Sequence, residues 1–332
     1  MNHETLLSRF IFWARRLAVI APLAVTLSLQ AQTFPDKPLS LVVGFPPGGA
    51  TDSAMRTVAE ELAKALGQGV VIDNRAGAGG AIATQYVVGA KPDGYTLLTA
   101  GLQLATGPHL NKVAYNPLKD LTMVGQLGNV PVLLLVKGDS KIQSAADLAA
   151  LAASRGDGIT VGTGGVGTTG HFGSLMLGTA LKVKTVHVPF KGGAPGLQAL
   201  ASGDVDVMFD QMSGSMLGLI QAGKVRVVAV MQNTRMTTLP QAKSAAEFGL
   251  ALDAPLQGWT GLAVHSGTPA PVVQKLRAAW MTAVDSAAVK AKVDQLGIDL
   301  DTRKSPEEFQ RFYLGELERW GAFIKKNQIT TQ

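Results

Sequence analysis

The chain has 332 residues, of which 46% are hydrophobic, and it contains no cysteine. This length and apolar content are enough for two domains, and the absence of cysteine excludes disulfides, thiolate metal ligands and a cysteine nucleophile. The formal net charge is +6, and removal of residues 1–31 leaves 27 basic against 23 acidic residues. This mildly basic balance, without a dense Lys/Arg cluster, excludes nucleic acid as a partner and suits a small acidic ligand.

The first 31 residues have the pattern of a secretory signal peptide. Arg9, Arg15 and Arg16 precede the apolar run 17–29, and Ala31 offers a small-residue cleavage site. The run is too short for a comfortable membrane span, and no stretch of about 18 uninterrupted apolar residues follows it. We therefore expect an exported protein that is cleaved near Ala31. The alternative is an uncleaved segment that serves as an anchor.

Residues 39–67 predict a buried strand, a Gly/Pro loop and an amphipathic helix. The β-branched run Leu41–Val43 suits a parallel sheet, and the loop 45–49 can continue neither a strand nor a helix. Thr51 or Asp52 is the expected N-cap, and a glycine follows the last helical turn. Such a unit directs free backbone N–H groups and roughly half a positive charge at the space above the sheet edge. The stretch therefore predicts an anion site, with an ordinary βα turn as the alternative.

A second copy of this arrangement lies in the middle of the chain. Ile159–Val161 is again β-branched, residues 162–170 form a glycine-rich loop, and His171–Lys182 can be the helix. His171 stands where this helix begins, either as a donor that faces a cleft or as a structural, capping histidine. Two anion sites in one chain suggest one ligand shared between them.

Strands alternate with helices along most of the chain, which predicts an α/β fold with a mostly parallel sheet. Further strands are expected over 70–73, 95–99, 130–136, 183–188, 205–209, 225–230 and 259–264. Further helices are expected over 80–89, 145–154 and 193–201, after the N-cap Thr268 with Pro269, and after Ser305, which opens a capping box. Domain crossovers are expected near 128–136 and 231–234. They give a first domain of residues 32–128 and 233–332 and a second of residues 129–232.

The glycine loops do not match a nucleotide site. Gly165–Gly170 fits G-x-G-x-x-G, but the acidic residue about twenty positions on, which would hold a ribose, is missing. Residues 162–169 lack the lysine of a Walker A loop. The histidines have no metal-ligand spacing, and no G-x-S-x-G elbow occurs. We therefore expect no cofactor and no metal, although a hydrolase remains possible.

Two carboxylates lie nearest the glycine loops. Asp52 fits either a helix cap or a direct or water-mediated ligand contact. Asp210 is delivered by the strand 205–209 to its far end. Lys191 is either a solvated loop residue or a charge partner for an anion.

Several motifs, in order along the chain, resemble the Bug family of extracytoplasmic solute receptors, which are associated with tripartite tricarboxylate transporters. They are G-F-P-P-G-G-A-T-D (Gly44–Asp52), N-R-A-G-A-G-G (Asn74–Gly80), K-P-D-G-Y-T-L-L (Lys91–Leu98), the glycine loop ending in His171, V-P-F-K-G-G-A-P (Val188–Pro195), Asp204–Asp210 and G-T-P (Gly267–Pro269). The resemblance covers nearly all of the chain from about Phe34 onward. Leu175 departs from it, because relatives usually have glutamate there.

The resemblance implies a two-domain, type II periplasmic-binding-protein fold of the Venus-flytrap kind. It implies a periplasmic receptor that closes around a small organic carboxylate, partly through water, and serves membrane transporter subunits without catalysis or a cofactor. We expect a monomer. The expected ligand-binding residues are Phe45, Pro46, Gly48, Gly49, Thr51, Asp52, Thr163, Gly164, Gly165, Val166, Gly167, Thr168, Thr169, His171, Phe190 and Asp210. The alternatives are an exported hydrolase or isomerase on the same fold and a sensory partner of a membrane kinase.

Overall fold

The computed structural model describes residues 34–252, 256–301 and 305–329, and its described residues beyond Asp36 form one compact unit. The expected signal peptide and its cleavage site lie outside the described residues. Within the described ranges, no helix combines the length and the apolar character needed to cross a bilayer.

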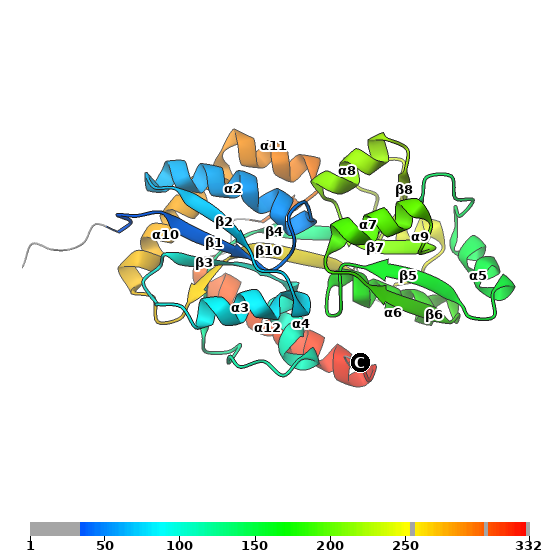
Figure 1. Cartoon of the computed structure of the whole chain (residues 1–332), viewed down its shortest axis with the longest axis horizontal. Coiled ribbons are helices and arrows are strands. Elements are labelled where there is room, and N and C mark those ends of the chain that lie inside the picture. Colours follow the sequence, from blue (N-terminus) through cyan, green and yellow to red (C-terminus); the bar gives the residue numbers. More distant parts are fainter. Residues whose placement is uncertain (1–33, 253–255, 302–304, 330–332) are drawn as a thin grey trace, which may run out of the picture. The chain divides into compact units, whose positions relative to one another are not determined.

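The elements alternate between strands and helices as expected (Figure 1). The strands are β1 (Leu39–Val43), β2 (Val70–Asn74), β3 (Thr96–Gly101), β4 (Leu121–Lys137), β5 (Ile159–Thr163), β6 (Thr185–Pro189), β7 (Val207–Gln211), β8 (Val225–Val230), β9 (Lys243–Ser244), β10 (Gln257–His265) and β11 (Asp299–Leu300). The helices are α2 (Ala50–Leu66), η2 (Ala78–Gly80), α3 (Ala81–Val88), α4 (Leu102–Leu110), α5 (Ala145–Ser154), α6 (Thr169–Leu181), α7 (Gly193–Ser202), α8 (Gly214–Gln221), α9 (Ala245–Phe248), α10 (Ala270–Asp285), α11 (Ala287–Gln295) and α12 (Pro306–Lys326).

The strands form one sheet in the order β2-β1-β3-β10-β4-β7-β5-β6, with β8 also on β4. We call β2, β1, β3, β10 and the N-terminal part of β4 the first half-sheet, and the C-terminal part of β4 with β7, β5, β6 and β8 the second half-sheet. Pairing is parallel for β2-β1-β3 and for β6-β5-β7, and antiparallel wherever β4 or β10 takes part. The expected parallel sheet is therefore present on both sides of an antiparallel centre.

The long strand β4 belongs to both half-sheets. Its residues 121–131 pair with β10, and its residues 132–137 pair with β7 and β8. The sequence predicted only residues 130–136, because Gly125 and Gly128 interrupt the apolar pattern. A β-carbon at Gly125 would overlap the Trp280 ring, and one at Gly128 would overlap the backbone of Asp299. The two glycines thus let α10 and β11 approach the strand closely.

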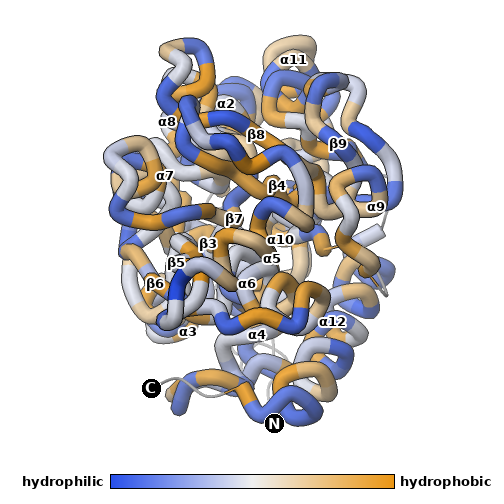
Figure 2. Tube along the Cα trace, turned by 90° about the vertical axis from the view of Figure 1, so that its right-hand side faces the viewer, coloured by the Kyte–Doolittle hydropathy of each residue, from blue (hydrophilic) through white to orange (hydrophobic). Residues whose placement is uncertain are grey.

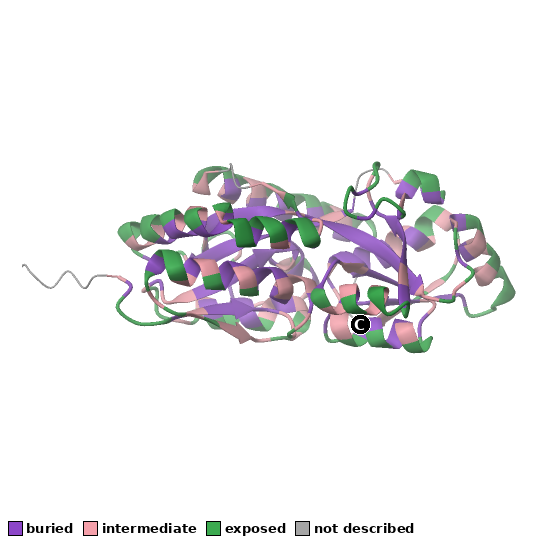
Figure 3. Cartoon of the chain, turned by 90° about the horizontal axis from the view of Figure 1, so that it is seen from above, coloured by how far each residue is buried: buried purple, intermediate pink, exposed green. Residues whose placement is uncertain are grey.

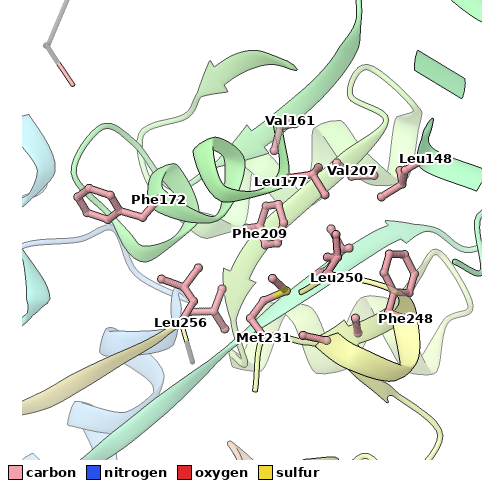
Figure 4. Packing of buried hydrophobic residues seen from close by; sticks show 14 of the residues in the cluster. Leu148, Val161, Phe172, Leu177, Val207, Phe209, Met231, Phe248, Leu250 and Leu256 are labelled. Atoms are coloured by element: carbon pink, nitrogen blue, oxygen red, sulfur yellow. The ribbon is translucent and has the colours of Figure 1, made fainter. Parts of the chain in front are cut away.

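Helices cover both faces of the sheet, so the inner strands are buried, whereas β2 and β6 at its edges are partly exposed (Figures 1 and 3). The tube in Figure 2 accordingly shows hydrophobic residues along β4 and β8 and mixed residues along the outer helices. In the first half-sheet, Leu98, Met123 and Trp259 pack against the aromatic side chains of α12. The second half-sheet packs against α5, α6 and α9 (Figure 4), and Trp320 of α12 joins this cluster with its ring centroid 4.3 Å from that of Phe172. The C-terminal helix therefore contacts both cores.

The segment after β8 stays with the second half-sheet. β9 pairs with β8, and Phe248 and Leu250 pack in the same core as Phe209. The expected return of the chain to the first domain, near residues 231–234, lies before this segment. β9 and α9 are too short to show a hydrophobic periodicity in the sequence.

Four of the expected helix starts were capping predictions. Ser144 caps α5, and Ser305 forms the predicted capping box of α12. The N-cap prediction for α10 was wrong by one residue, because Pro269 rather than Thr268 occupies the N-cap. The prediction for α2 was also wrong, because its N-cap is Gly49, which has no side chain to cap the helix.

Candidate ligand-binding site

A cavity of about 70 Å³ lies where the C-terminal ends of β1, β3, β5 and β7 meet. Its size suits only a small ligand, since drug-sized sites measure about 300–1,000 Å³. It is lined by Phe45, Gly49, Ala50, Thr51, Ala54, Ala100, Gly101, Leu102, Gln103, Val130, Gly164, Thr168, Thr169, Gly193, Asp210, Gln211, Met212, Trp259, Thr260 and Ile298. An adjoining opening of about 330 Å³ shares Phe45 and Gly164 with this cavity. Both half-sheets contribute to the lining.

The first glycine loop is organised by the buried carboxylate of Asp52. Its Oδ2 accepts the backbone N–H of Gly48 at 2.8 Å, and both oxygens accept from the Arg56 guanidinium at 2.8 Å. Asn74 donates to Oδ1 of Asp52 and to the carbonyl of Phe45, each at 2.9 Å. Burial raises the pKa of Asp52, but the hydrogen bonds from Arg56, Gly48 and Asn74 outweigh it and hold the pKa below 3.8. Asp52 is therefore an anion that shapes the loop, and it does not line the cavity.

The second glycine loop is closed by side chains on its own helix. Thr168 is the N-cap of α6, and its hydroxyl donates to the carbonyl of Gly165 at 2.7 Å. The N–H of Gly167 donates to Nδ1 of His171 at 3.2 Å. Because Nδ1 accepts this bond, the imidazole is neutral and carries its proton on Nε2. His171 is thus a structural histidine below the loop.

A second histidine supports the same loop. The His187 ring stacks on the His171 ring with centroids 4.3 Å apart, and its Nε2 lies 2.7 Å from Oγ1 of Thr163. Thr163 in turn accepts the N–H of Gly165 at 3.2 Å. Burial, and to a smaller extent the charge of His187, lower the pKa of His171 to about 4, and burial also lowers the pKa of His187. Both rings are therefore neutral at pH 7.

Asp210 differs from Asp52 in having no cationic partner. Its Oδ1 accepts the N–H of Gln211 at 2.9 Å, whereas its Oδ2 is buried and makes no hydrogen bond with the described residues. Burial raises the pKa of Asp210 to about 7, and the bond from Gln211 opposes this shift. The residue lies at the end of β7 and lines the cavity.

Hydrogen bonds join the two half-sheets around the cavity. Ser215, which lies on α8, donates to the carbonyl of Gly48 at 2.7 Å, and the N–H of Gly214 donates to Oγ of Ser53 at 3.0 Å. On another side, the Thr106 hydroxyl donates to the carbonyl of Gly167 at 2.8 Å. Each glycine loop is therefore bonded to an element of the opposite half-sheet.

The structure brings most of the predicted site residues to this region. Those that line the cavity are Phe45, Gly49, Thr51, Gly164, Thr168, Thr169 and Asp210, and those that line the adjoining opening also include Pro46, Gly165, Val166 and Phe190. The remaining predicted residues are Gly48, Asp52, Thr163, Gly167 and His171, which line neither space and support the loops from behind.

Sequence reasoning missed the contribution of two other strand ends. Residues 100–103 follow β3 into the N-terminus of α4, and residues 259–260 lie on β10. The strand before α4 was predicted, and ligands bind beyond the carboxyl ends of parallel strands, so its end could have been included. Gln103 is the polar side chain that this signal would have added, whereas Thr260 lies on the antiparallel strand β10 and is not indicated by it.

The chain is similar to known proteins in both sequence and fold. The model of the tripartite tricarboxylate transporter family receptor matches residues 54–329. The periplasmic binding protein BugD is 31% identical, with a TM-score of 0.83 over 90% of this chain and 100% of that chain. These matches confirm the expected two-domain periplasmic-binding-protein fold.

Two similar structures contain ligands. MatC from Rhodopseudomonas palustris, solved with bound malate, is 35% identical, with a TM-score of 0.81 over 88% of this chain and 100% of that chain. Rpa4515 from R. palustris, solved with adipate, is 31% identical, with a TM-score of 0.83 over 90% of this chain and 100% of that chain. Both ligands are small dicarboxylates.

Proposed function

Because this chain belongs to the tripartite tricarboxylate transporter receptor family, we propose that it captures a small organic acid in the periplasm and presents it to the membrane subunits of such a transporter. Family membership confirms the resemblance to the Bug receptors. The observation that carries the proposal is a small cavity between two glycine loops, each of which precedes a helix N-terminus.

The helix N-termini explain how an acid can bind without a cationic side chain. The first residues of α2 and α6 line the cavity, and helix N-termini leave backbone N–H groups unpaired and carry partial positive charge. Of the described residues around the cavity, none is Lys, Arg or His. A carboxylate placed between the two N-termini would receive charge-assisted hydrogen bonds from neutral donors. The malate and adipate ligands of MatC and Rpa4515 support this class of ligand.

We further propose that binding closes two lobes around the acid. The first lobe comprises the first half-sheet and its helices, and the second comprises the second half-sheet, with crossovers in β4 and before β10. The bonds from Ser215 and Thr106 to the glycine loops would form on closure. A ligand that bridges the loops favours the closed state, because it binds that state more tightly.

The proposed receptor is an exported protein and a monomer. The relatives are periplasmic binding proteins, which supports export, and we place the cleavage after Ala31. Mass spectrometry of the exported protein should find an N-terminus near Gln32, whereas a membrane-bound species that retains Met1 would contradict this cleavage. We also propose a monomer, which a mass measurement in solution would test.

The direct test is incubation of the purified protein with a library of organic acids and their carboxamides. Binding is followed by titration calorimetry, and the solution is then examined by NMR for any new compound. We expect at least one acid to bind without being converted, and its carboxamide to bind much more weakly. Turnover of any compound would instead support the exported hydrolase or isomerase.

A further inference from the structure

Three buried side-chain polar atoms around the cavity have no hydrogen-bond partner among the described residues. They are Oδ2 of Asp210, Oγ1 of Thr260 and Nε1 of Trp259, and all three residues line the cavity. A buried polar group without a partner costs about 1–3 kcal/mol. A ligand that supplies the missing bonds would recover this cost. The Asp210 oxygen is the most informative of the three, because a carboxylate accepts hydrogen bonds and cannot donate them.

The position of the Asp210 carboxyl is fixed by α7. A β-carbon at Gly193, the first residue of α7, would overlap Oδ2 of Asp210, so the carboxyl fills the space at this helix N-terminus. A helix N-terminus favours a negative charge. The protein therefore places its own carboxyl at α7, while the N-termini of α2 and α6 remain available to an acid.

The surroundings of Asp210 offer no counter-charge within the described residues of the lining. The elements packed against β7 are β4, β5, α6 and α7. The strand β5 and the helix α7 contain no titratable residue, α6 contains only His171, which is neutral, and β4 contains only Lys137 at the far end of its pairing with β7. Lys191 precedes α7 but lines the adjoining opening instead of the cavity. These elements therefore give Asp210 no charged partner, and a ligand in the cavity can supply a donor to it.

We infer that Asp210 determines which acids bind: the preferred ligand carries a hydroxyl or ammonium group next to its carboxylate, and this group donates a hydrogen bond to the Asp210 side chain. The inference rests on the proposed function, because it places the ligand carboxylate at α2 and α6. An unsubstituted acid leaves Asp210 without a partner and places a second negative group close to it. Acids with the donor are therefore favoured over acids of the same carbon skeleton without it.

The test compares matched acids that differ only in this substituent. The sets are succinate, malate and aspartate; glutarate, 2-hydroxyglutarate and glutamate; propionate, lactate and alanine; and phenylacetate, mandelate and phenylglycine. Titration calorimetry at pH 8, where Asp210 is ionised, gives the dissociation constant of each acid for the mature protein. In at least one set, we expect the hydroxy or amino acid to bind at least tenfold more tightly than the unsubstituted acid.

Variants link this preference to Asp210. In Asp210→Leu, which keeps the branched shape but removes the acceptors, the preference should fall below threefold. Asp204→Leu is the matched control, since Asp204 is exposed and outside the cavity, and it should keep the full preference. If Asp210→Leu does not fold, Gly193→Ala gives the same test, because its β-carbon displaces the Asp210 carboxyl. Gly218→Ala is its control, since a β-carbon there meets no atom within 4 Å.

The outcomes separate this inference from the proposed function. Tight binding of an unsubstituted acid, equal to or stronger than that of its hydroxy and amino counterparts, would overturn the inference and leave the proposed function intact. Proton uptake on binding of such an acid would show that Asp210 acts instead as a neutral donor, which also overturns it. Failure of all acids to bind, while a neutral compound binds, would contradict the proposed function itself.

Discussion

The hydroxyl of Ser215 donates a hydrogen bond to the carbonyl oxygen of Gly48 at 2.7 Å, and so connects helix α8 with the first glycine loop. On the other side of that loop, Asp52 accepts the N–H of the same Gly48. The loop is therefore held from its own lobe by Asp52 and from the opposite lobe by Ser215. The first contact is local to the lobe, whereas the second depends on how the lobes meet.

Replacement of Ser215 should therefore weaken closure without damaging the fold. In Ser215→Ala the bond to Gly48 is lost, and a hydrogen bond contributes about 1 kcal/mol net, which corresponds to roughly fivefold in affinity. We expect this loss in calorimetric titration of the bound acid, with an unchanged melting temperature of the free protein. Ser154→Ala is the control, because Ser154 bonds only within the end of α5. An unchanged affinity in Ser215→Ala would show that this contact does not assist closure.

Valine at Gly49 should reduce binding more than folding. Gly49 lies at the N-cap of α2 with φ −73°, which any residue can adopt, and a β-carbon there would be 3.5 Å from the carbonyl of Pro46. The side chain would, however, enter the space lined by Gly49. We expect Gly49→Val to weaken binding at least tenfold, about 1.4 kcal/mol, with a small change in unfolding free energy.

Valine at Gly165 should reduce both binding and folding. Gly165 has φ +126°, which L side chains rarely adopt, and its β-carbon would lie 3.2 Å from the carbonyl of Phe190. In urea unfolding, Gly165→Val should therefore have a lower free energy of unfolding than Gly49→Val. Gly156→Val serves as the control for both, because a β-carbon at Gly156 meets nothing within 4 Å. Parent-like binding by both loop variants would mean that the acid does not sit on the loops.

The buried His171 should make the fold sensitive to acid. Its pKa is lowered from 6.5 to about 4, so the unfolded chain binds a proton there at a higher pH than the folded chain does. The free energy of unfolding contributed by this group therefore falls as the pH drops from about 6.5 to about 4. His171→Asn keeps an acceptor for the Gly167 N–H but does not titrate. In urea unfolding, the variant should gain stability relative to the parent as the pH is lowered through this window. A difference in unfolding free energy that does not change with pH would contradict the lowered pKa of His171.

The contribution of Asp210 to the stability of the fold should depend on pH in the opposite direction. Its pKa is raised from 3.8 to about 7, so the folded chain holds the proton to a higher pH than the unfolded chain does. Its contribution to the free energy of unfolding therefore falls as the pH rises from about 4 to about 7. Asp210→Asn should be more stable than the parent at pH 8 by about 1 kcal/mol or more, and nearly equal at pH 4. Equal stability at both values would indicate that the carboxyl is not destabilised by burial.

The parts of the fold that were predictable depend on local patterns. The strands before the two glycine loops, the N-cap Ser144 and the capping box at Ser305 involve residues a few positions apart, which a sequence displays directly. The role of Asp52 was not predictable in this way. Its carboxylate shapes the loop because Asn74, on the neighbouring strand β2, completes its hydrogen bonds.

The same distinction applies to the candidate site. The two glycine loops can be recognised from the sequence alone. Residues 100–103 reach the cavity only because β3 lies beside β1 in the sheet. From the sequence, His171 is suited equally to a donor that faces a cleft and to a structural, capping histidine. Its ring stacks on His187 of β6 and its Nδ1 accepts the Gly167 N–H, which favours the structural role.

The most direct test of the central claim is a set of thermal melts of the mature protein over small organic acids and neutral sugars. An acid held between the glycine loops binds the folded state alone, so at 100 times its dissociation constant it should stabilise the fold by about 2.7 kcal/mol. We predict that at least one small organic acid raises the melting temperature and that neutral sugars leave it unchanged. A rise with a neutral sugar, and with no acid, would contradict the claim that this protein is a receptor for organic acids.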